Sequence, residues 1–187
     1  TNDRRQRQMC IRDRSTLLRL IAGLTVADEF DGDISASDGF ALTNRTSVMS
    51  QSDLLLPWLS VLENIVLGAR LRGQVPDFDR AENMLIRVGL ADHMQKKPNA
   101  LSGGMRQRTA LARTLMEDRP VALLDEPFSA LDASTRADMQ ELAAEVLLGK
   151  TVLLVTHDPA EAVRLGHQIM VLTPDAVQPW PTPDMPP

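Results

Sequence analysis

The sequence predicts an α/β protein with a parallel sheet and an inserted helical subdomain. The apolar run at residues 120–124 follows a charged helix end and has no polar alternation, which is typical of a strand buried on both faces of a parallel sheet. A second apolar run, rich in β-branched residues, covers residues 151–156. Residues 52–117 place apolar residues at helical spacing instead. We therefore expect a core lobe made of residues 15–51 and 118–173, and a helical subdomain between them.

The first predicted elements are a helix and a strand. Residues 15–24 place apolar side chains on one helical face, and Gly23 lies near the end, where glycine commonly stops a helix. Thr46–Ser50 is predicted to be a strand that leads into Gln51. A glutamine can offer its oxygen to Mg²⁺ and its amide to a water molecule, although a glutamine after a strand is common.

The helical subdomain is predicted to contain two amphipathic helices, at Val61–Leu71 and Asp79–Val88, with Gly89 ending the second. The loop before them places Pro57 and Trp58 among leucines. Apolar bulk in a loop indicates a docking surface for another protein. An equally good interpretation is that these residues cover the core of the helical subdomain.

A glycine-rich turn at Ser102, Gly103 and Gly104 precedes a polar helix start. Ser102 can cap the helix, and we expect the backbone N–H groups of Gly103, Gly104 and Met105 to point outward at the positive end of the helix dipole. Such a turn can hold a phosphate group, and a Cβ atom there would keep the backbone away from an anion. The alternative is a glycine turn that only caps a surface helix.

Ionisable residues follow the two apolar strands. Asp125 and Glu126 end the first, and His157 ends the second, at the sheet edge where open α/β proteins bind ligands. Two adjacent carboxylates at a strand end point in different directions, so they can serve different purposes. His93 and His167 have no comparable context and are expected to be surface residues.

The order of these motifs resembles that of the ATP-binding cassette (ABC) ATPases. Residues 101–108, Leu-Ser-Gly-Gly-Met-Arg-Gln-Arg, are similar to the family's signature loop, and residues 129–132, Ser-Ala-Leu-Asp, to its D-loop. The resemblance implies a P-loop NTPase-like core. It also implies that the turn at Ser102, Gly103 and Gly104, called the signature turn below, reaches the γ-phosphate held by a partner chain. Gln107 is expected to contact the same nucleotide.

The resemblance further implies roles for the sheet-edge residues. Asp125 is similar to the Walker B aspartate, which supports Mg²⁺, and Glu126 to the general base that orients the attacking water. Gln51 matches the Q-loop glutamine, which reaches Mg²⁺, and His157 the switch histidine, which hydrogen-bonds the γ-phosphate. Asp132 belongs to the D-loop and is expected near the nucleotide.

The Walker A loop is missing from this pattern. The helix at residues 15–24 resembles the helix that follows such a loop, so Ser15 and Thr16 are expected to contact the nucleotide and Ser15 to ligate Mg²⁺. The glycines and lysine of the loop would fall at Gln8, Ile11, Asp13 and Arg14, and none of the four matches. Asp13 would repel phosphate, and the arginine cannot replace lysine's compact charge. The predicted core is therefore incomplete at its N-terminus, and we expect the chain as written to be inactive.

Residues 1–14 differ in composition from the rest. They contain five Arg and two Asp, whereas the whole chain has a net charge of −5. We interpret them as a non-native or disordered arm, similar to a translated sequencing adaptor. A DNA-binding arm is the competing interpretation. It is poorly supported, because no aromatic residues are interleaved with the arginines. Residues 174–187 are expected to form an irregular tail, since the last 15 residues contain six prolines.

The composition limits the class of protein. With 43% hydrophobic and 24% charged residues, a chain of 187 residues can bury one substantial core. The negative net charge argues against nucleic acid as a partner. The single cysteine, Cys10, allows no disulfide framework, so a reducing cytoplasm is expected. The chain has no apolar run long enough to span a membrane, so a membrane role must come through partners.

The resemblance implies an ATP-hydrolysing subunit of an importer, with ATP and Mg²⁺ as cofactors. Such subunits form homodimers or heterodimers at the cytoplasmic face of the membrane and bind permease subunits, which work with a solute-binding protein. The run Leu55–Ser60 is similar to the branch importing nitrate, sulfonates, taurine or thiamine precursors. The alternatives are an ABC ATPase of DNA repair or translation, and a catalytically dead fragment or pseudo-ATPase.

Overall fold

A computed structural model describes residues 14–24, 34–173 and 176–180. The central sheet is parallel, with the strand order β1-β2-β3. Its strands are β1 (Thr46–Met49), β2 (Val121–Asp125) and β3 (Thr151–Val155). Val121 lies opposite both Thr46 and Thr151, so the carboxyl ends of the three strands meet at one edge. This arrangement confirms the predicted α/β fold class with a parallel sheet.

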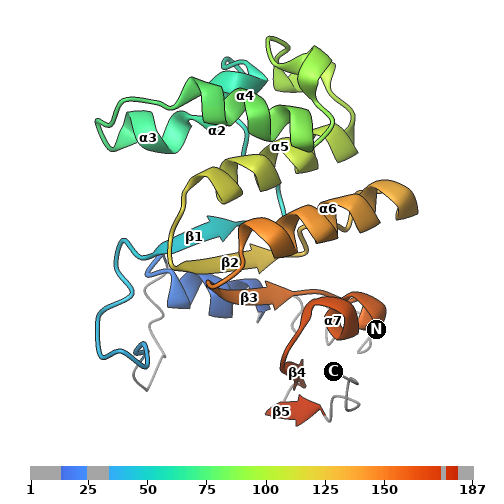
Figure 1. Cartoon of the computed structure of the whole chain (residues 1–187). Helices are drawn as coiled ribbons and strands as arrows, with labels where there is room; N and C mark the ends of the chain where they lie inside the picture. Colours follow the sequence, from blue (N-terminus) through green and yellow to red (C-terminus); the bar gives the residue numbers. More distant parts are fainter. Residues whose placement is uncertain (1–13, 25–33, 174–175, 181–187) are drawn as a thin grey trace, which may run out of the picture.

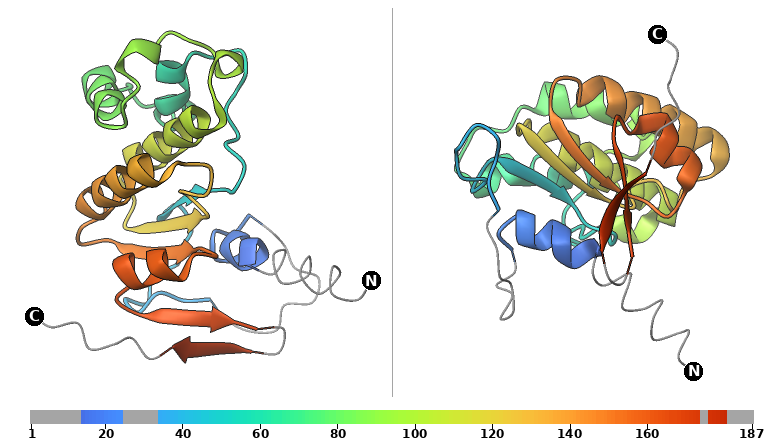
Figure 2. Two further views of the ribbon diagram at one scale, coloured as in Figure 1. Left: turned by 90° about the vertical axis from the view of Figure 1, so that its right-hand side faces the viewer. Right: turned by 90° about the horizontal axis from the view of Figure 1, so that it is seen from below.

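The helical subdomain forms a layer above the sheet (Figures 1 and 2). The single helix predicted at residues 61–71 is divided at Val66, whereas the helix predicted at residues 79–88 is present. Ser60 begins the first helix with a capping box, in which its hydroxyl accepts from the Glu63 N–H and its own N–H donates to the Glu63 carboxylate. The elements are α2 (Val61–Ile65), α3 (Leu67–Leu71), α4 (Phe78–Arg87), the 3₁₀ turns Ala91–His93 and Pro98–Ala100, and α5 (Gly103–Met116).

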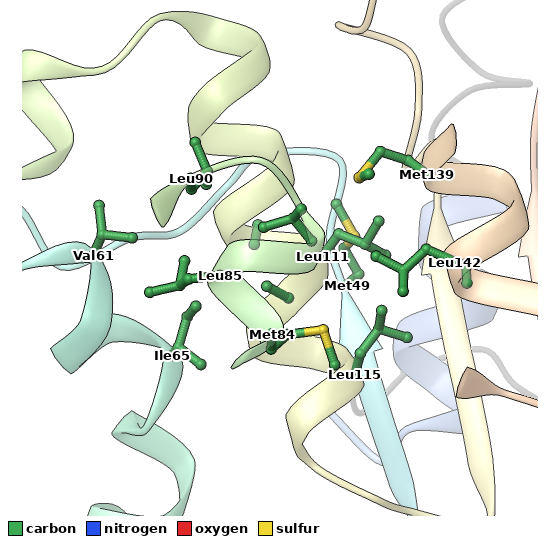
Figure 3. Packing of buried hydrophobic residues seen from close by; sticks show 14 of the residues in the cluster. Met49, Val61, Ile65, Met84, Leu85, Leu90, Leu111, Leu115, Met139 and Leu142 are labelled. Carbon is green, nitrogen blue, oxygen red and sulfur yellow. The ribbon is translucent and has the colours of Figure 1, made fainter. Parts of the chain in front are cut away.

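One hydrophobic cluster joins the helical subdomain to the sheet (Figure 3). Helix α5 lies at its centre, with Leu111 and Leu115 buried against side chains of the helical subdomain such as Leu85. On the other side the cluster continues to Met49 of β1 and Leu142 of α6 (Ala133–Val146). The signature turn is therefore fixed to the sheet through a continuous apolar core.

The end of the described chain differs from the prediction. After α7 (Pro159–Leu165), strands β4 (Ile169–Leu172) and β5 (Val177–Trp180) form an antiparallel pair. The prediction of an irregular tail was therefore wrong for β5, which includes Pro179. Proline is tolerated there because β5, within the described residues, is an edge strand that pairs with β4 alone.

The predicted helix ends agree with the backbone geometry. Residues 14–21 are helical, and Gly23 has a φ of +69° with its N–H donating to the carbonyl of Leu20. Gly89, after α4, has a φ of +68°. Glycine reaches these left-handed angles without a steric cost.

The arm prediction concerns residues that lie outside the described ones, except for Arg14. Within the described residues, no helix is long and apolar enough to cross a membrane.

Candidate nucleotide site

The carboxyl edge of the sheet brings together three of the predicted site residues. The Gln51 Nε2 atom donates to Oε2 of Glu126 at 3.4 Å, and His157 Nδ1 lies 3.1 Å from Oε1 of the same carboxylate. The Glu126 side chain is 14% exposed, whereas that of His157 is 64% exposed. The general-base candidate therefore lies between an amide and an imidazole that can both donate to it.

The backbone of Glu126 is held in an unusual conformation. Its φ is +49°, a left-handed angle that costs a non-glycine residue about 1–2 kcal/mol. The Glu126 N–H donates to the carbonyl of Val155 at 2.8 Å, and the Glu126 carbonyl accepts from the Ser129 hydroxyl at 3.0 Å. These bonds fix the direction in which the carboxylate leaves the strand.

Asp125 is buried next to the start of the first helix. The Ser15 hydroxyl donates to Oδ2 of Asp125 at 2.5 Å, across 110 residues of sequence. Asp125 is 7% exposed, and Thr16 lies exposed beside Ser15. The fold thus joins two residues that the sequence analysis assigned to Mg²⁺.

The signature turn has the predicted cap, but one predicted donor is already used. The Ser102 hydroxyl accepts from the Met105 N–H at 3.3 Å, so the expectation that the Met105 N–H is free was wrong. The two glycines differ in their surroundings. A Cβ atom on Gly103 would meet nothing within 4 Å, whereas one on Gly104 would lie 3.3 Å from the carbonyl oxygen of Ala130.

Gln107, predicted to contact nucleotide, is 6% exposed and bonded within its own chain. Its Nε2 atom donates to the Glu126 carbonyl at 2.9 Å and to the Ser129 hydroxyl at 3.3 Å, and its Oε1 atom accepts from the Ala130 N–H at 2.7 Å. The side chain therefore faces the turn between β2 and α6.

Asp132 caps α6 at the end of that turn. Its carboxylate accepts from the Thr135 N–H and from the Ser134 hydroxyl. These hydrogen bonds lower the pKa of Asp132 from 3.8 to about 2, and the bond from the Thr135 N–H has the largest effect. Asp132 is therefore ionised at neutral pH and stabilises the N-terminus of the helix.

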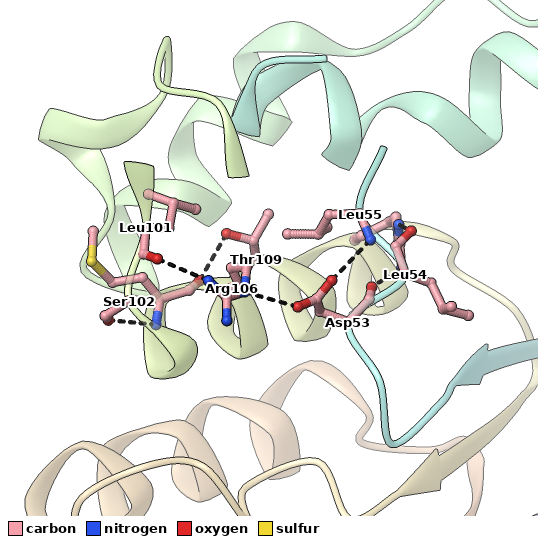
Figure 4. A network of polar contacts seen from close by, with 9 residues as sticks. Asp53, Leu54, Leu55, Leu101, Ser102, Arg106 and Thr109 are labelled. Carbon is pink, nitrogen blue, oxygen red and sulfur yellow. Dashed lines mark hydrogen bonds and ion pairs between the residues drawn. The ribbon is translucent and has the colours of Figure 1, made fainter. Parts of the chain in front are cut away.

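Sequence reasoning missed a polar network between the loop after β1 and α5 (Figure 4). Asp53 accepts from Nε of Arg106 at 3.1 Å, and Arg106 also donates to the Leu101 carbonyl at 3.0 Å. Arg113, two helical turns later, donates to the carbonyls of Asp53 and Leu54. Burial lowers the pKa of Arg113, while Asp53 and Glu117 act in the opposite direction. The i, i+7 spacing of the two arginines was the available sequence signal.

A second missed network supports the segment before His157. Glu161, which is 6% exposed, accepts from the Thr156 hydroxyl and from Nε2 of Gln140. The Thr156 hydroxyl in turn accepts from the Asp158 N–H at 3.0 Å. The strand end that carries His157 is thus anchored to both α6 and α7.

The apolar loop before α2 is divided between core and surface. Leu55 is buried, but Leu54 and Trp58 are 61% and 64% exposed, so the interpretation of this loop as core cover holds for Leu55 and fails for Trp58. The side chain of Asn64 is buried and binds the backbone of Leu56 through both its oxygen and its nitrogen. The hydrogen bonds of Asn64 therefore hold the backbone of the loop that contains Trp58.

Comparisons with known proteins agree with this geometry. The ABC transporter family profile matches residues 14–129. An uncharacterized ABC transporter ATP-binding protein of Haemophilus influenzae is 48% identical over 161 residues, which are 85% of this chain and 65% of that protein. An aliphatic sulfonates import ATP-binding protein of Rhodococcus jostii is 45% identical over 166 residues, 88% of this chain and 65% of that protein. The chain thus spans about two thirds of the length of these relatives.

Solved structures show the same fold. A dimeric ATP-binding cassette in a post-hydrolysis state, bound to ADP and phosphate, matches with a TM-score of 0.69 and 32% identity. The match covers 84% of this chain and 75% of the cassette chain. Another dimeric structure of the same cassette, described as a bacterial ABC transporter cassette, has a TM-score of 0.70 and 31% identity, with the same coverage.

Proposed function

Because the chain belongs to the ABC transporter family of ATP-binding subunits, we propose that it represents a subunit that binds and hydrolyses ATP to drive import of a small solute. The observation that carries this proposal is the Glu126 carboxylate, placed between Gln51 and His157 and adjacent to Asp125. A carboxylate in this position can take a proton from a water molecule that attacks a phosphoryl group.

The residues around Asp125 suit Mg²⁺. Within the described residues, no group of three acidic, histidine or cysteine side chains is arranged so that it could hold a metal ion by itself. Mg²⁺ does not require one, because it keeps several waters and phosphate oxygens as ligands. The Ser15 hydroxyl, which is bonded to Asp125, the Gln51 side-chain oxygen and, through water, Asp125 would supply the hard oxygen ligands that it prefers. When bound, the ion would neutralise charge on the phosphates of ATP.

Two chains are needed to complete the proposed site. Gly103 borders open space in this chain, which supports an approach by the nucleotide of a partner to the turn formed by Ser102, Gly103 and Gly104. The structural neighbours are dimers. We place Asp132 and Thr16 near the same interface, in a homodimer or heterodimer.

The general base can be tested in a completed chain, in which a strand and a glycine-rich loop ending in lysine replace residues 1–14 before Ser15. Glu126→Gln should lower ATP turnover by about 10²–10⁴-fold, because the amide keeps the shape but cannot accept the proton. ATP-driven dimerisation, measured by light scattering, should persist. Turnover above a tenth of the parent rate would show that Glu126 is not the base.

Trp58 supports a permease as the membrane partner. An exposed tryptophan on a braced loop is a suitable anchor for a partner protein, and Trp58→Ala should weaken permease binding by about 2 kcal/mol or more. The melting temperature and the basal ATPase rate of the completed chain should stay unchanged. Leu71→Ala, at an apolar position on α3 that is even more exposed, is the control. Unchanged permease binding by Trp58→Ala would remove the structural argument for transport.

The relatives named for aliphatic sulfonate import support a sulfonate as the solute, delivered by a solute-binding protein. The other solutes of the same branch remain alternatives. In this proposal the subunit lies on the cytoplasmic face of the membrane.

The second candidate is a catalytically dead chain, and residues 8–14 favour it, because they lack the glycines and the lysine that would hold the β- and γ-phosphates. Calorimetric titration of the chain as written with Mg-ATP should show no saturable binding below millimolar concentration. A micromolar Kd would exclude this candidate.

A further inference from the structure

We propose that Gln107 is a positioning residue, which couples the signature turn at the start of α5 to the turn that carries Glu126. The motif alone placed Gln107 among the nucleotide contacts. Its carboxamide instead makes three hydrogen bonds to the turn between β2 and α6, at the Glu126 carbonyl, the Ser129 hydroxyl and the Ala130 N–H. A buried amide whose oxygen and nitrogen are both bonded in this way has a structural task within its own chain.

The bonds of Gln107 act on a strained part of the backbone. Glu126 has a left-handed φ of +49°, and its N–H is held from the β3 side by the Val155 carbonyl. Gln107 holds the carbonyl of the same residue from the α5 side. A strained residue keeps its conformation only when its surroundings determine it, so removing one of these supports should let the Glu126 backbone relax.

Gly104 makes the coupling stiff. It lies three residues before Gln107 on the same face of α5, and it approaches so closely that a Cβ atom would lie 3.3 Å from the Ala130 carbonyl oxygen. The start of α5 therefore contacts the turn between β2 and α6 through Gly104 and is hydrogen-bonded to that turn through Gln107. A displacement of the signature turn must move the turn that carries Glu126.

The consequence rests on the proposed function. In a head-to-tail pair, the signature turn of one chain contacts the nucleotide of its partner, whereas Glu126 serves the nucleotide of its own chain. Gln107 then links the occupancy of one nucleotide site to the position of the base at the other.

The first test uses the chain as it exists and follows the Ala130 amide by hydrogen exchange in NMR spectra. Gln107→Leu should raise its exchange rate about tenfold, since it removes the acceptor. Gln107→Glu keeps an acceptor oxygen and should restore protection to within about twofold. Thr114→Val is the matched control, because the buried Thr114 hydroxyl donates to the Ala110 carbonyl of its own helix, and the substitution should leave Ala130 unchanged. Equal exchange in Gln107→Leu and the parent, or the same rise in Thr114→Val, would overturn the coupling.

The second test separates positioning from nucleotide contact in the completed chain. Gln107→Leu should lower kcat about tenfold while the KM for ATP changes less than about twofold, because the base moves but the nucleotide contacts remain. A raised KM with unchanged kcat would make Gln107 a nucleotide contact and overturn the proposal. If the completed chain shows no ATPase activity at all, the proposed function fails, and the amide exchange still decides the coupling.

Discussion

Strands β2 and β3 lie side by side with similar apolar sequences but are buried very differently. Leu123 and Leu153 are opposite each other in register, yet Leu123 is 1% exposed and Leu153 is 36% exposed. Strand β2 has hydrogen-bonded neighbours on both sides, whereas β3, within the described residues, pairs with β2 alone. The burial of an apolar strand is thus decided by its neighbours more than by its own composition.

The two strands also end differently. Strand β2 ends in the buried Asp125, with Ser15 bonded to it. The segment after β3 ends in the exposed His157, and the residue before it, Thr156, is hydrogen-bonded to Glu161. The carboxylate of Asp125 is therefore held in place by a bond within the chain, while much of the His157 imidazole faces solvent.

The largest expected effect tests the difference in burial directly. Leu123→Ala should lower the free energy of unfolding by about 2–5 kcal/mol, because it leaves a cavity in a packed core. Leu153→Ala, one strand over, should cost about 1 kcal/mol or less, because much of that side chain already contacts water. Urea unfolding of the two variants measures both losses. Equal losses would mean that Leu153 is covered in the folded chain.

An intermediate effect tests the strand ends. Ser15→Ala should cost about 1–3 kcal/mol of stability, because it deprives a buried carboxylate of a donor. His157→Ala should change stability by no more than about 0.5 kcal/mol, as is usual for an exposed side chain. Thermal unfolding at neutral pH compares the two. A large loss in His157→Ala would show that the imidazole supports the Glu126 turn structurally.

The smallest effect concerns the turn that follows β2. Asp132 has a pKa lowered from 3.8 to about 2, so its contribution to stability is complete above about pH 4 and is lost as the pH falls toward 2. Asp132→Asn keeps an acceptor for the Thr135 N–H but cannot titrate. The difference in melting temperature between parent and variant should therefore shrink between pH 4 and pH 2. A difference that is independent of pH would contradict the hydrogen-bonded, ionised cap.

The parts of the fold that depend on neighbours in the chain were predictable. Gly23 and Gly89 mark helix ends because only glycine adopts their backbone angles cheaply, and Ser102 and Asp132 begin helices because each side chain accepts from the backbone N–H three residues later. The meeting of Gln51, Glu126 and His157 followed from parallel strands with a common carboxyl edge.

What could not be predicted depends on contacts across many residues. Strand β5 needs β4 as its partner, and the exposure of Trp58 depends on how the loop is braced by Asn64. The bond between Arg106 and Asp53 joins residues 53 positions apart, and the i, i+7 spacing of Arg106 and Arg113 places both on one helical face without identifying Asp53 as the partner.

The sequence by itself determined the fold class, the family resemblance and the order of the site residues, because strand composition, caps and turns are local chemistry. Only the tertiary structure decided that Gln107 faces the turn of its own chain, that Glu161 supports His157, and that β3 is exposed where β2 is buried. The physical reason is that hydrogen-bond partners and burial are set by whichever segment packs alongside, and that segment can be 19 positions away, as for Gln107 and Glu126, or 110 positions away, as for Ser15 and Asp125.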